Sequence, residues 1–211
     1  NNLKMKIKSI FAILATVLVL LTATSTNVSA QCPDKLSPQW YAQIHGGFSF
    51  LFVEGARKGV GAAGGSVAAG TYLTPIWGVR LQILGGRYTN PTFRGGDVPE
   101  FKFNQIGFFP QATFSVTNAI FWKKKGYEPK LNFLLVAGPG YIKTFGFNNG
   151  EKGYSAFSII GALEVNYLIT KNFYVDLMYS MNPITDKYNG HTGGFPFDGT
   201  IDLMIGLGLK F

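Results

Sequence analysis

The sequence predicts an all-β protein: an eight-stranded antiparallel transmembrane up-and-down β-barrel preceded by a cleaved signal peptide. Three observations predict this fold class. The chain starts with a basic and then apolar segment of the kind that directs export. After it, apolar residues alternate with small or polar ones in eight segments separated by turn signals. The composition is 46% hydrophobic and only 14% charged, with no second long apolar run that a membrane helix would need.

The first segment is interpreted as a secretory signal peptide. Lys4, Lys6 and Lys8 form a basic region, Ile10–Leu21 is apolar, and cleavage is expected after Ala30. A spanning helix is disfavoured because it requires about 20 apolar residues. The predicted organisation is therefore a signal peptide over residues 1–30, an N-terminal periplasmic segment over 31–39 and the transmembrane barrel over 40–211.

Cys32 is the single cysteine, so an intrachain disulfide is excluded. A lipid anchor on this residue is disfavoured, because lipoprotein signals place a small residue before the cysteine and Gln31 stands there.

Each predicted strand has a period of two. In Trp40–Phe52 one face is apolar, with residues such as Ile44 and Phe48, and the other carries Gln43 and His45. The eight segments are residues 40–52, 64–74, 77–89, 101–117, 131–146, 154–168, 173–182 and 200–211.

The second face of these strands favours a barrel over a soluble sandwich. It carries mostly Gly, Ala, Ser and Gln, whereas a face in bulk water would be rich in charge. Strands of about 9 to 11 residues or more, apolar outside, are what a membrane barrel needs. Aromatic residues near the expected strand ends are typical of interface girdles. They are Trp40, Tyr72, Trp77, Phe121, Trp122, Tyr167, Phe173 and Phe211.

Connection lengths predict the orientation. Residues 74–76 and 168–172 are short joints, which belong to the periplasmic side, while 53–63, 90–100 and 183–199 are long outer loops. Residues 118–130 are a long exception on the periplasmic side, whose Trp and Lys residues are expected to anchor that rim.

The segment Gly59–Gly64 (GVGAAG) matches the GxGxxG pattern of dinucleotide-binding loops. A strand pattern rather than a helix follows it, and an acidic residue about 20 positions later is missing. We interpret the match as accidental, with glycines that shape the first outer loop and the start of the second strand.

Alternation places a set of polar side chains inside the barrel, as a predicted polar network of the lumen. They are Arg80, Gln82, Gln105, Gln111, Glu164, Asp176 and Asp202. Charges in a narrow lumen should be paired, because an isolated buried charge is costly. Two interpretations remain: a hydrogen-bonded plug, or a gated path for water and small ions.

Catalytic, cofactor and metal sites are not predicted. His45 and His191 are the two histidines, and neither is paired in sequence with a serine and an acid at a recognisable spacing. His45 is expected to fill the barrel interior. The net charge of +8 is not gathered on a helix, so nucleic acid is not an expected partner.

Three segments carry a resemblance to a known family. They are Gln111–Asn118 (QATFSVTN), Ala137–Tyr141 (AGPGY) and Gly206–Phe211 (GLGLKF). From about Trp40 onward the chain resembles the small outer-membrane barrels of the OmpA/OmpX type, without the peptidoglycan-binding domain of full-length OmpA proteins.

The resemblance implies the outer membrane of a Gram-negative bacterium. It implies contact with outer-membrane lipid and lipopolysaccharide, and an assembly signal at Leu207, Leu209 and Phe211 read by the barrel-assembly machinery. The expected function is non-enzymatic: a structural role in membrane integrity, or surface interaction with an external ligand at the loops. The alternative is a narrow porin or channel for water, ions or small solutes.

Overall fold

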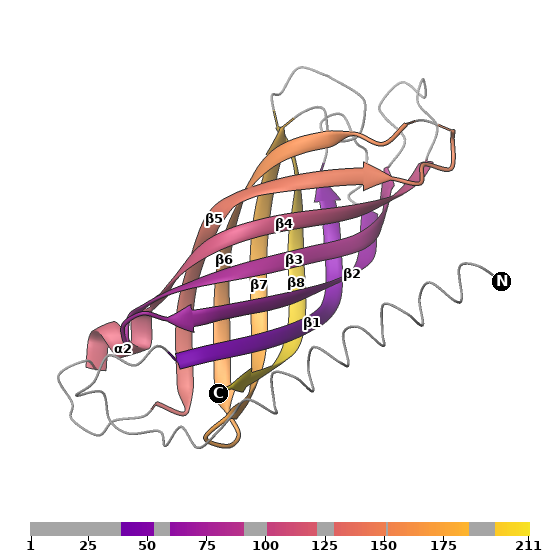
Figure 1. Ribbon diagram of the computed structural model, residues 1–211. Helices are drawn as coiled ribbons and strands as arrows, with labels where there is room; N and C mark the ends of the chain where they lie inside the picture. The colour runs from indigo at the N-terminus through magenta and orange to yellow at the C-terminus, as the bar shows by residue number, and fades with distance from the viewer. Residues whose placement is uncertain (1–38, 53–59, 91–100, 122–128, 151, 186–196) are drawn as a thin grey trace. The chain divides into compact units, whose positions relative to one another are not determined.

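The computed structural model describes residues 39–52, 60–90, 101–121, 129–150, 152–185 and 197–211. In these residues eight strands form a closed antiparallel barrel in which consecutive strands pair and the last pairs with the first (Figure 1). The elements are β1 (Gln39–Phe52), β2 (Val60–Tyr72), β3 (Trp77–Asn90), β4 (Phe101–Ser115), α2 (Val116–Phe121), β5 (Leu131–Phe145), β6 (Ser155–Leu168), β7 (Phe173–Thr185) and β8 (Phe197–Lys210). The predicted fold class is confirmed. The signal peptide and the segment up to residue 38 lie outside the described residues.

Closure of the barrel pairs β1 with β8 from Tyr41↔Lys210 to Phe52↔Gly199. A closed sheet leaves no edge whose backbone groups lipid would have to satisfy. The strands contain 13 to 15 residues, which exceeds the length needed to cross a bilayer. No helix among the described residues is both long and apolar enough to cross a membrane.

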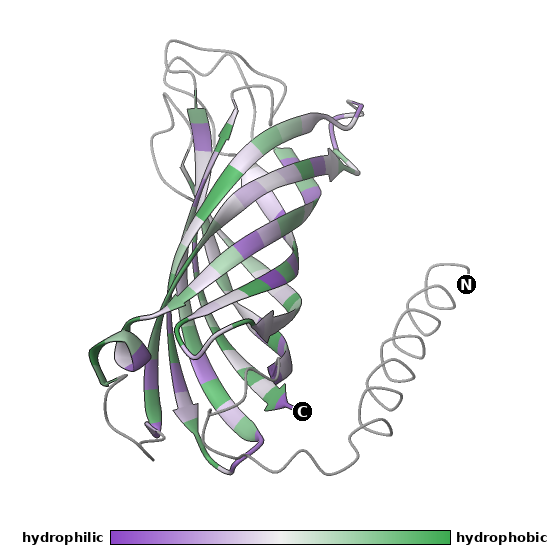
Figure 2. Ribbon diagram, turned by 60° about the vertical axis from the view of Figure 1, so that its left-hand side comes forward, coloured by the Kyte–Doolittle hydropathy of each residue, from purple (hydrophilic) through white to green (hydrophobic). Residues whose placement is uncertain are grey.

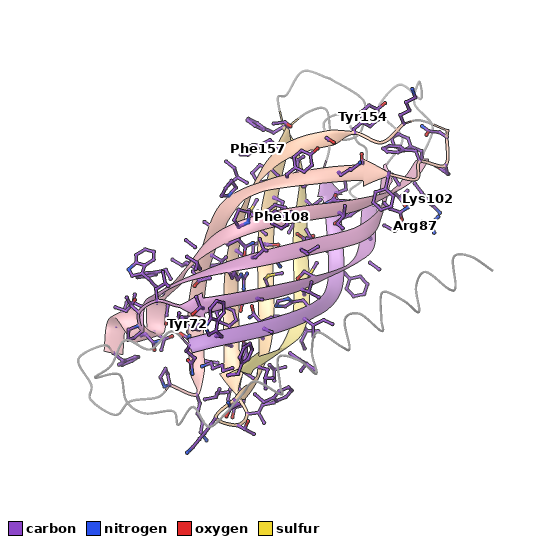
Figure 3. The ribbon with its side chains drawn as sticks, viewed as in Figure 1. Tyr72, Arg87, Lys102, Phe108, Tyr154 and Phe157 are labelled. Atoms are coloured by element: carbon purple, nitrogen blue, oxygen red, sulfur yellow. The ribbon has the colours of Figure 1, made fainter. Side chains whose placement is uncertain are left out.

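The two faces of the wall differ as the alternation predicts. On β8, Leu203 and Ile205 are 47% and 64% exposed, while Met204 between them is 1% exposed. Hydrophobic and hydrophilic residues alternate along the strands (Figure 2), and Phe108 and Phe157 lie on the exposed side (Figure 3). A wall of exposed large apolar side chains is a surface for lipid rather than water.

Several predicted strand boundaries are wrong. Residues 116–117 were expected in a strand but begin α2, because the Ser115 hydroxyl accepts a hydrogen bond from the Asn118 N–H at 3.1 Å and caps a helix. β7 runs past Asn182 to Thr185, since Pro183 still pairs with Gly199 of β8.

The second strand begins at Val60, four residues before the expected start at Gly64. The described part of GVGAAG is thus strand, paired with β1 from Leu51↔Val60 to Gly47↔Gly64. A phosphate loop would require a helix N-terminus after these glycines, and a strand follows instead.

The lumen is not uniformly small or polar, which corrects the expectation for its outer half. At the end of the barrel that carries the predicted outer loops, Tyr88, Phe101, Phe103 and Phe147 form an aromatic cluster. The ring centroids of Phe103 and Phe147 are stacked 5.1 Å apart. Inward side chains of a narrow closed barrel pack on one another rather than on water, so rings fill this space as well as polar groups do.

Candidate functional site: a polar plug across the lumen

A salt bridge crosses the barrel interior. Arg80 of β3 donates from Nη1 to Oε2 of Glu164 on β6 at 2.5 Å, and both side chains are fully buried. β3 and β6 are not neighbours in the sheet, so this contact spans the lumen. Gln43 of β1 completes a triangle: its Oε1 accepts from Arg80 Nη1 at 2.9 Å, and its Nε2 donates to Glu164 Oε1.

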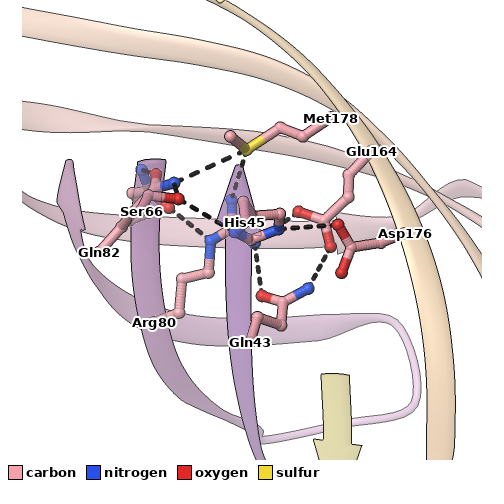
Figure 4. A network of polar contacts seen from close by, with 9 residues as sticks. Gln43, His45, Ser66, Arg80, Gln82, Glu164, Asp176 and Met178 are labelled. Carbon is pink, nitrogen blue, oxygen red and sulfur yellow. Dashed lines mark hydrogen bonds and ion pairs between the residues drawn. The ribbon is translucent and has the colours of Figure 1, made fainter. Parts of the chain in front are cut away.

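A chain of amide groups extends from the salt bridge along the inner wall (Figure 4). Arg80 Nε donates to Gln111 Oε1 at 2.5 Å, and Gln111 Nε2 donates to Gln82 Oε1 at 2.7 Å. Gln82 Nε2 then donates to the Ser66 hydroxyl at 2.8 Å, which lies 3.0 Å from Nδ1 of His45. Each donor of this chain therefore meets an acceptor on a neighbouring strand.

His45 joins this chain to a second acid. Its Nε2 lies 2.8 Å from Oδ1 of Asp176 on β7, and both side chains are fully buried. Gly206 of β8 stands between them in the register. A Cβ at Gly206 would lie 2.4 Å from the His45 ring and 2.6 Å from Asp176 Oδ1, so only glycine leaves room for this pair.

The paired arrangement has an electrostatic reason. Arg80 and Glu164 compensate each other, and the His45 imidazole faces the Asp176 carboxylate at ion-pair distance. Removing one member of such a pair leaves a charge that water does not reach. We call this set (Gln43, His45, Ser66, Arg80, Gln82, Gln111, Glu164 and Asp176) the plug.

All seven polar residues predicted from alternation are buried, but only five of them belong to the plug. Asp202 lies in a separate cluster on β7 and β8, where its Oδ2 accepts from Ser180 at 2.9 Å and from Asn182 at 2.5 Å. Gln105 lies between Gly86 and Thr144 in the register. This position is four pairs from the pair of Gln82 with Phe109, toward the predicted outer loops.

Gln43 and Ser66 are absent from the predicted polar network, and His45 was expected only to fill the interior. Alternation already places Gln43 and His45 on the polar face of the first strand, but their contacts depend on the closed barrel. Ser66 carries no charge, and its role depends on the register that sets it opposite His45.

Ser66, His45 and Asp176 form a serine–histidine–acid row that the sequence spacing did not reveal. The Ser66 hydroxyl already accepts a hydrogen bond from Gln82, and the three residues are 2% to 4% exposed. A nucleophile must reach its substrate and have donors for the developing oxyanion. In the described residues this row is buried away from access, so it contributes to the plug and gives no positive evidence for catalysis.

His45, Glu164 and Asp176 also have ligand atoms within 4.8 Å of one another, a grouping that would suit a metal ion. Both Glu164 oxygens already accept hydrogen bonds from Arg80 and Gln43. A cation here would also lie beside the positive Arg80, so the geometry fits the salt bridge better than a metal.

The assembly signal is the last predicted set. Leu207 is 48% exposed and Leu209 half-buried, on the outward face of β8 with Leu203 and Ile205. Phe211 follows the strand. The recognition of these residues during assembly stays a prediction.

Comparison with known proteins shows the fold. No protein-family model and no curated protein sequence matches the chain. Among solved structures, it is similar to Neisserial surface protein A (16% identity, 82% of this chain and 97% of that one, TM-score 0.54). It is also similar to a major outer membrane protein of Thermus thermophilus (12% identity, 83% and 100%, TM-score 0.54). A third is Ail, the attachment invasion locus protein of Yersinia pestis, in complex with the heparin analogue sucrose octasulfate (15% identity, 82% and 99%, TM-score 0.50).

These likenesses and the apolar exterior together identify an outer-membrane β-barrel, and the predicted resemblance to small barrels of this type is confirmed. At identities this low, the similar structures show the fold of the chain but not its role.

Proposed function

We propose that this protein is a closed, non-enzymatic barrel of a Gram-negative outer membrane, sealed across its lumen by the plug and serving membrane integrity and surface contact. The observation that carries the proposal is the Arg80–Glu164 salt bridge, which joins two strands that are not neighbours across the lumen. An eight-stranded barrel is just wide enough for side chains to fill. An ion on the axis would have to displace this pair and the amides around it.

The exterior of β3 to β5 supports contact with lipopolysaccharide. Arg87, Lys102 and Lys143 are exposed near the outer ends of these strands, and the first two are labelled in Figure 3. The register brings them close together, because Arg87 pairs with Asn104, two residues from Lys102, and Lys143 pairs with Ile106. We call these three residues the basic rim. Basic side chains at the membrane surface attract anionic lipid groups, and phosphates are their strongest partners.

The closed lumen is tested by conductance in planar bilayers. We expect the wild-type protein to show little or intermittent current. Arg80→Ala should conduct more and prefer cations, because Glu164 and Asp176 then leave the lumen negative and draw in water. Arg87→Ala is the matched control, since it removes an exposed arginine from the same strand.

Two results would refute the proposal. Large, steady wild-type channels would favour the alternative function, a narrow porin. Equal currents for wild type and Arg80→Ala would mean that this arginine does not seal the lumen.

A further inference from the structure

The ladder between β4 and β5 is interrupted in its middle, although both strands are fully described. The pairs that flank the interruption are Phe108↔Tyr141 and Ala112↔Ala137. Counting inward from both pairs sets Pro110 opposite Pro139, at the centre of three register positions without pairs. Neither proline has an N–H to donate, so two ladder hydrogen bonds are absent at this point of the wall.

A second interruption lies on the other side of β6. Between the pairs Ser158↔Ile184 and Gly161↔Met181, two register positions lack pairs, and Pro183 occupies one of them. The hairpin of β5 and β6 is itself paired continuously from Leu131↔Tyr167 to Lys143↔Ser155. This hairpin, which we call the panel, is thus bounded on both sides by weakened ladders.

From Glu164 toward the predicted outer loops, most side chains of the panel are apolar on both faces, and the buried polar exceptions are Thr144 and Ser158. Toward the lumen it presents Val136, Ile142, Ile160 and Ala162, which are at most 7% exposed. Its lipid face carries exposed large side chains: Leu135, Tyr141, Phe157, Ile159 and Leu163. On β2 and β3 the inward face includes the polar Ser66 and Gln82. Between the levels of Glu164 and Lys143, an apolar molecule crossing the panel would meet no charged side chain.

Phe109 closes the β4–β5 interruption from the inside. A Cβ at Gly140 would lie 2.2 Å from the Phe109 ring, so the ring lies directly on the backbone of β5. Phe109 pairs with Gln82, and the next inward residues of the two strands, Arg80 and Gln111, belong to the plug. The interruption therefore stands where the plug meets the aromatic cluster.

An apolar groove lies on the outside of the same wall, with a volume of about 490 Å³. Its lining includes Ala112, Ala137, Gly161 and Met181, which are the residues of the flanking pairs on the periplasmic side of both interruptions. Its lining combines these small side chains with bulkier ones such as Trp77 and Leu163. One groove thus connects the two weakened ladders on the side that faces lipid.

We propose that the panel is a lateral gate, through which an uncharged molecule with a flexible hydrocarbon chain moves between the aromatic cluster of the lumen and the hydrocarbon core of the bilayer. The absent hydrogen bonds lower the cost of parting β4 from β5, and rotation of the Phe109 ring uncovers Gly140. The plug blocks the axis below, so the side wall is the remaining exit. This activity goes beyond the closed barrel proposed above.

The gate is tested by locking it. In a Cys32→Ser background, Phe108→Cys with Tyr141→Cys places a disulfide across the β4–β5 ladder at register partners on the exposed face. The readout is uptake of the apolar fluorophore N-phenyl-1-naphthylamine by intact Gram-negative cells that produce the protein. We expect uptake several-fold faster than in cells without it, loss of this gain on oxidation, and recovery with a reductant. The matched control is Phe48→Cys with Leu203→Cys, across the uninterrupted β1–β8 ladder.

A second variant needs no disulfide. Pro110→Val with Pro139→Val supplies two N–H donors to the interrupted ladder and should slow uptake, with slower amide hydrogen exchange at Gly138 and Gly140. Folding of each variant is checked by its heat-modifiable mobility on gels. Three results would overturn the gate. Wild-type uptake could be no faster than in cells without the protein. Uptake could be unchanged in both the locked and the valine variants, or the Phe48–Leu203 control could lose as much uptake as the locked variant. Bilayer conductance reports on the plug alone, so the two proposals fail separately.

Discussion

Replacing Glu164 by Gln should destabilise the barrel strongly although it keeps the shape of the side chain. The change leaves the guanidinium of Arg80 buried without the carboxylate that its Nη1 contacts at 2.5 Å. Breaking one partner of a buried pair costs about 3 to 5 kcal/mol, and Arg80→Met should cost a similar amount. If the two effects were independent, the double variant would lose about 6 to 10 kcal/mol.

The double variant Arg80→Met/Glu164→Gln should instead lose much less. It contains neither charge, and its main cost is that Gln43 and Gln111 each lose a charged hydrogen-bond partner, about 1 to 3 kcal/mol for each. The coupling free energy between positions 80 and 164 should therefore be on the order of 3 kcal/mol or more.

The assay is reversible urea unfolding in phospholipid vesicles, followed by tryptophan fluorescence, for the four proteins of the cycle. Arg87→Met serves as the control and should change the free energy of unfolding by no more than about 0.5 kcal/mol. Additivity of the two single variants within about 0.5 kcal/mol would show that Arg80 and Glu164 are not partners in the membrane.

Two further predictions concern the exterior. Leu203→Arg should lower the free energy of unfolding by about 2 to 4 kcal/mol, because this exposed residue faces the hydrocarbon core. Leu203→Phe should be nearly neutral, and equal losses for the two variants in the urea assay would contradict the lipid-facing assignment. Replacing Arg87, Lys102 and Lys143 of the basic rim together by Ala should weaken binding to lipopolysaccharide in a co-sedimentation assay, while Lys171→Ala in the short β6–β7 turn should not. Unchanged binding by the triple variant would remove the basic rim as the contact.

Much of the fold follows from local sequence because side-chain direction in a strand has a period of two. Leu203 and Met204 show how far this goes: adjacent in the chain, they lie on opposite faces of the wall, as alternation requires. The same rule put Arg80, Glu164 and Asp176 in the lumen. It was less reliable at the strand ends, where the Ser115 cap starts a helix and the small residues after Val60 extend β2 beyond the pattern.

The sequence by itself thus determined which face each residue occupies, and the tertiary structure alone decided which residues meet. Arg80 and Glu164 are 84 positions apart, and their contact depends on closure of the sheet, which sets β3 across the lumen from β6. The register of β8 between β1 and β7 likewise places Gly206 between His45 and Asp176, where its lack of a side chain leaves room for that pair. Two prolines, in β4 and β5, become an interruption only because the register sets them opposite each other. Period and polarity are local properties of a strand, whereas contacts across a barrel depend on the register of every ladder around it.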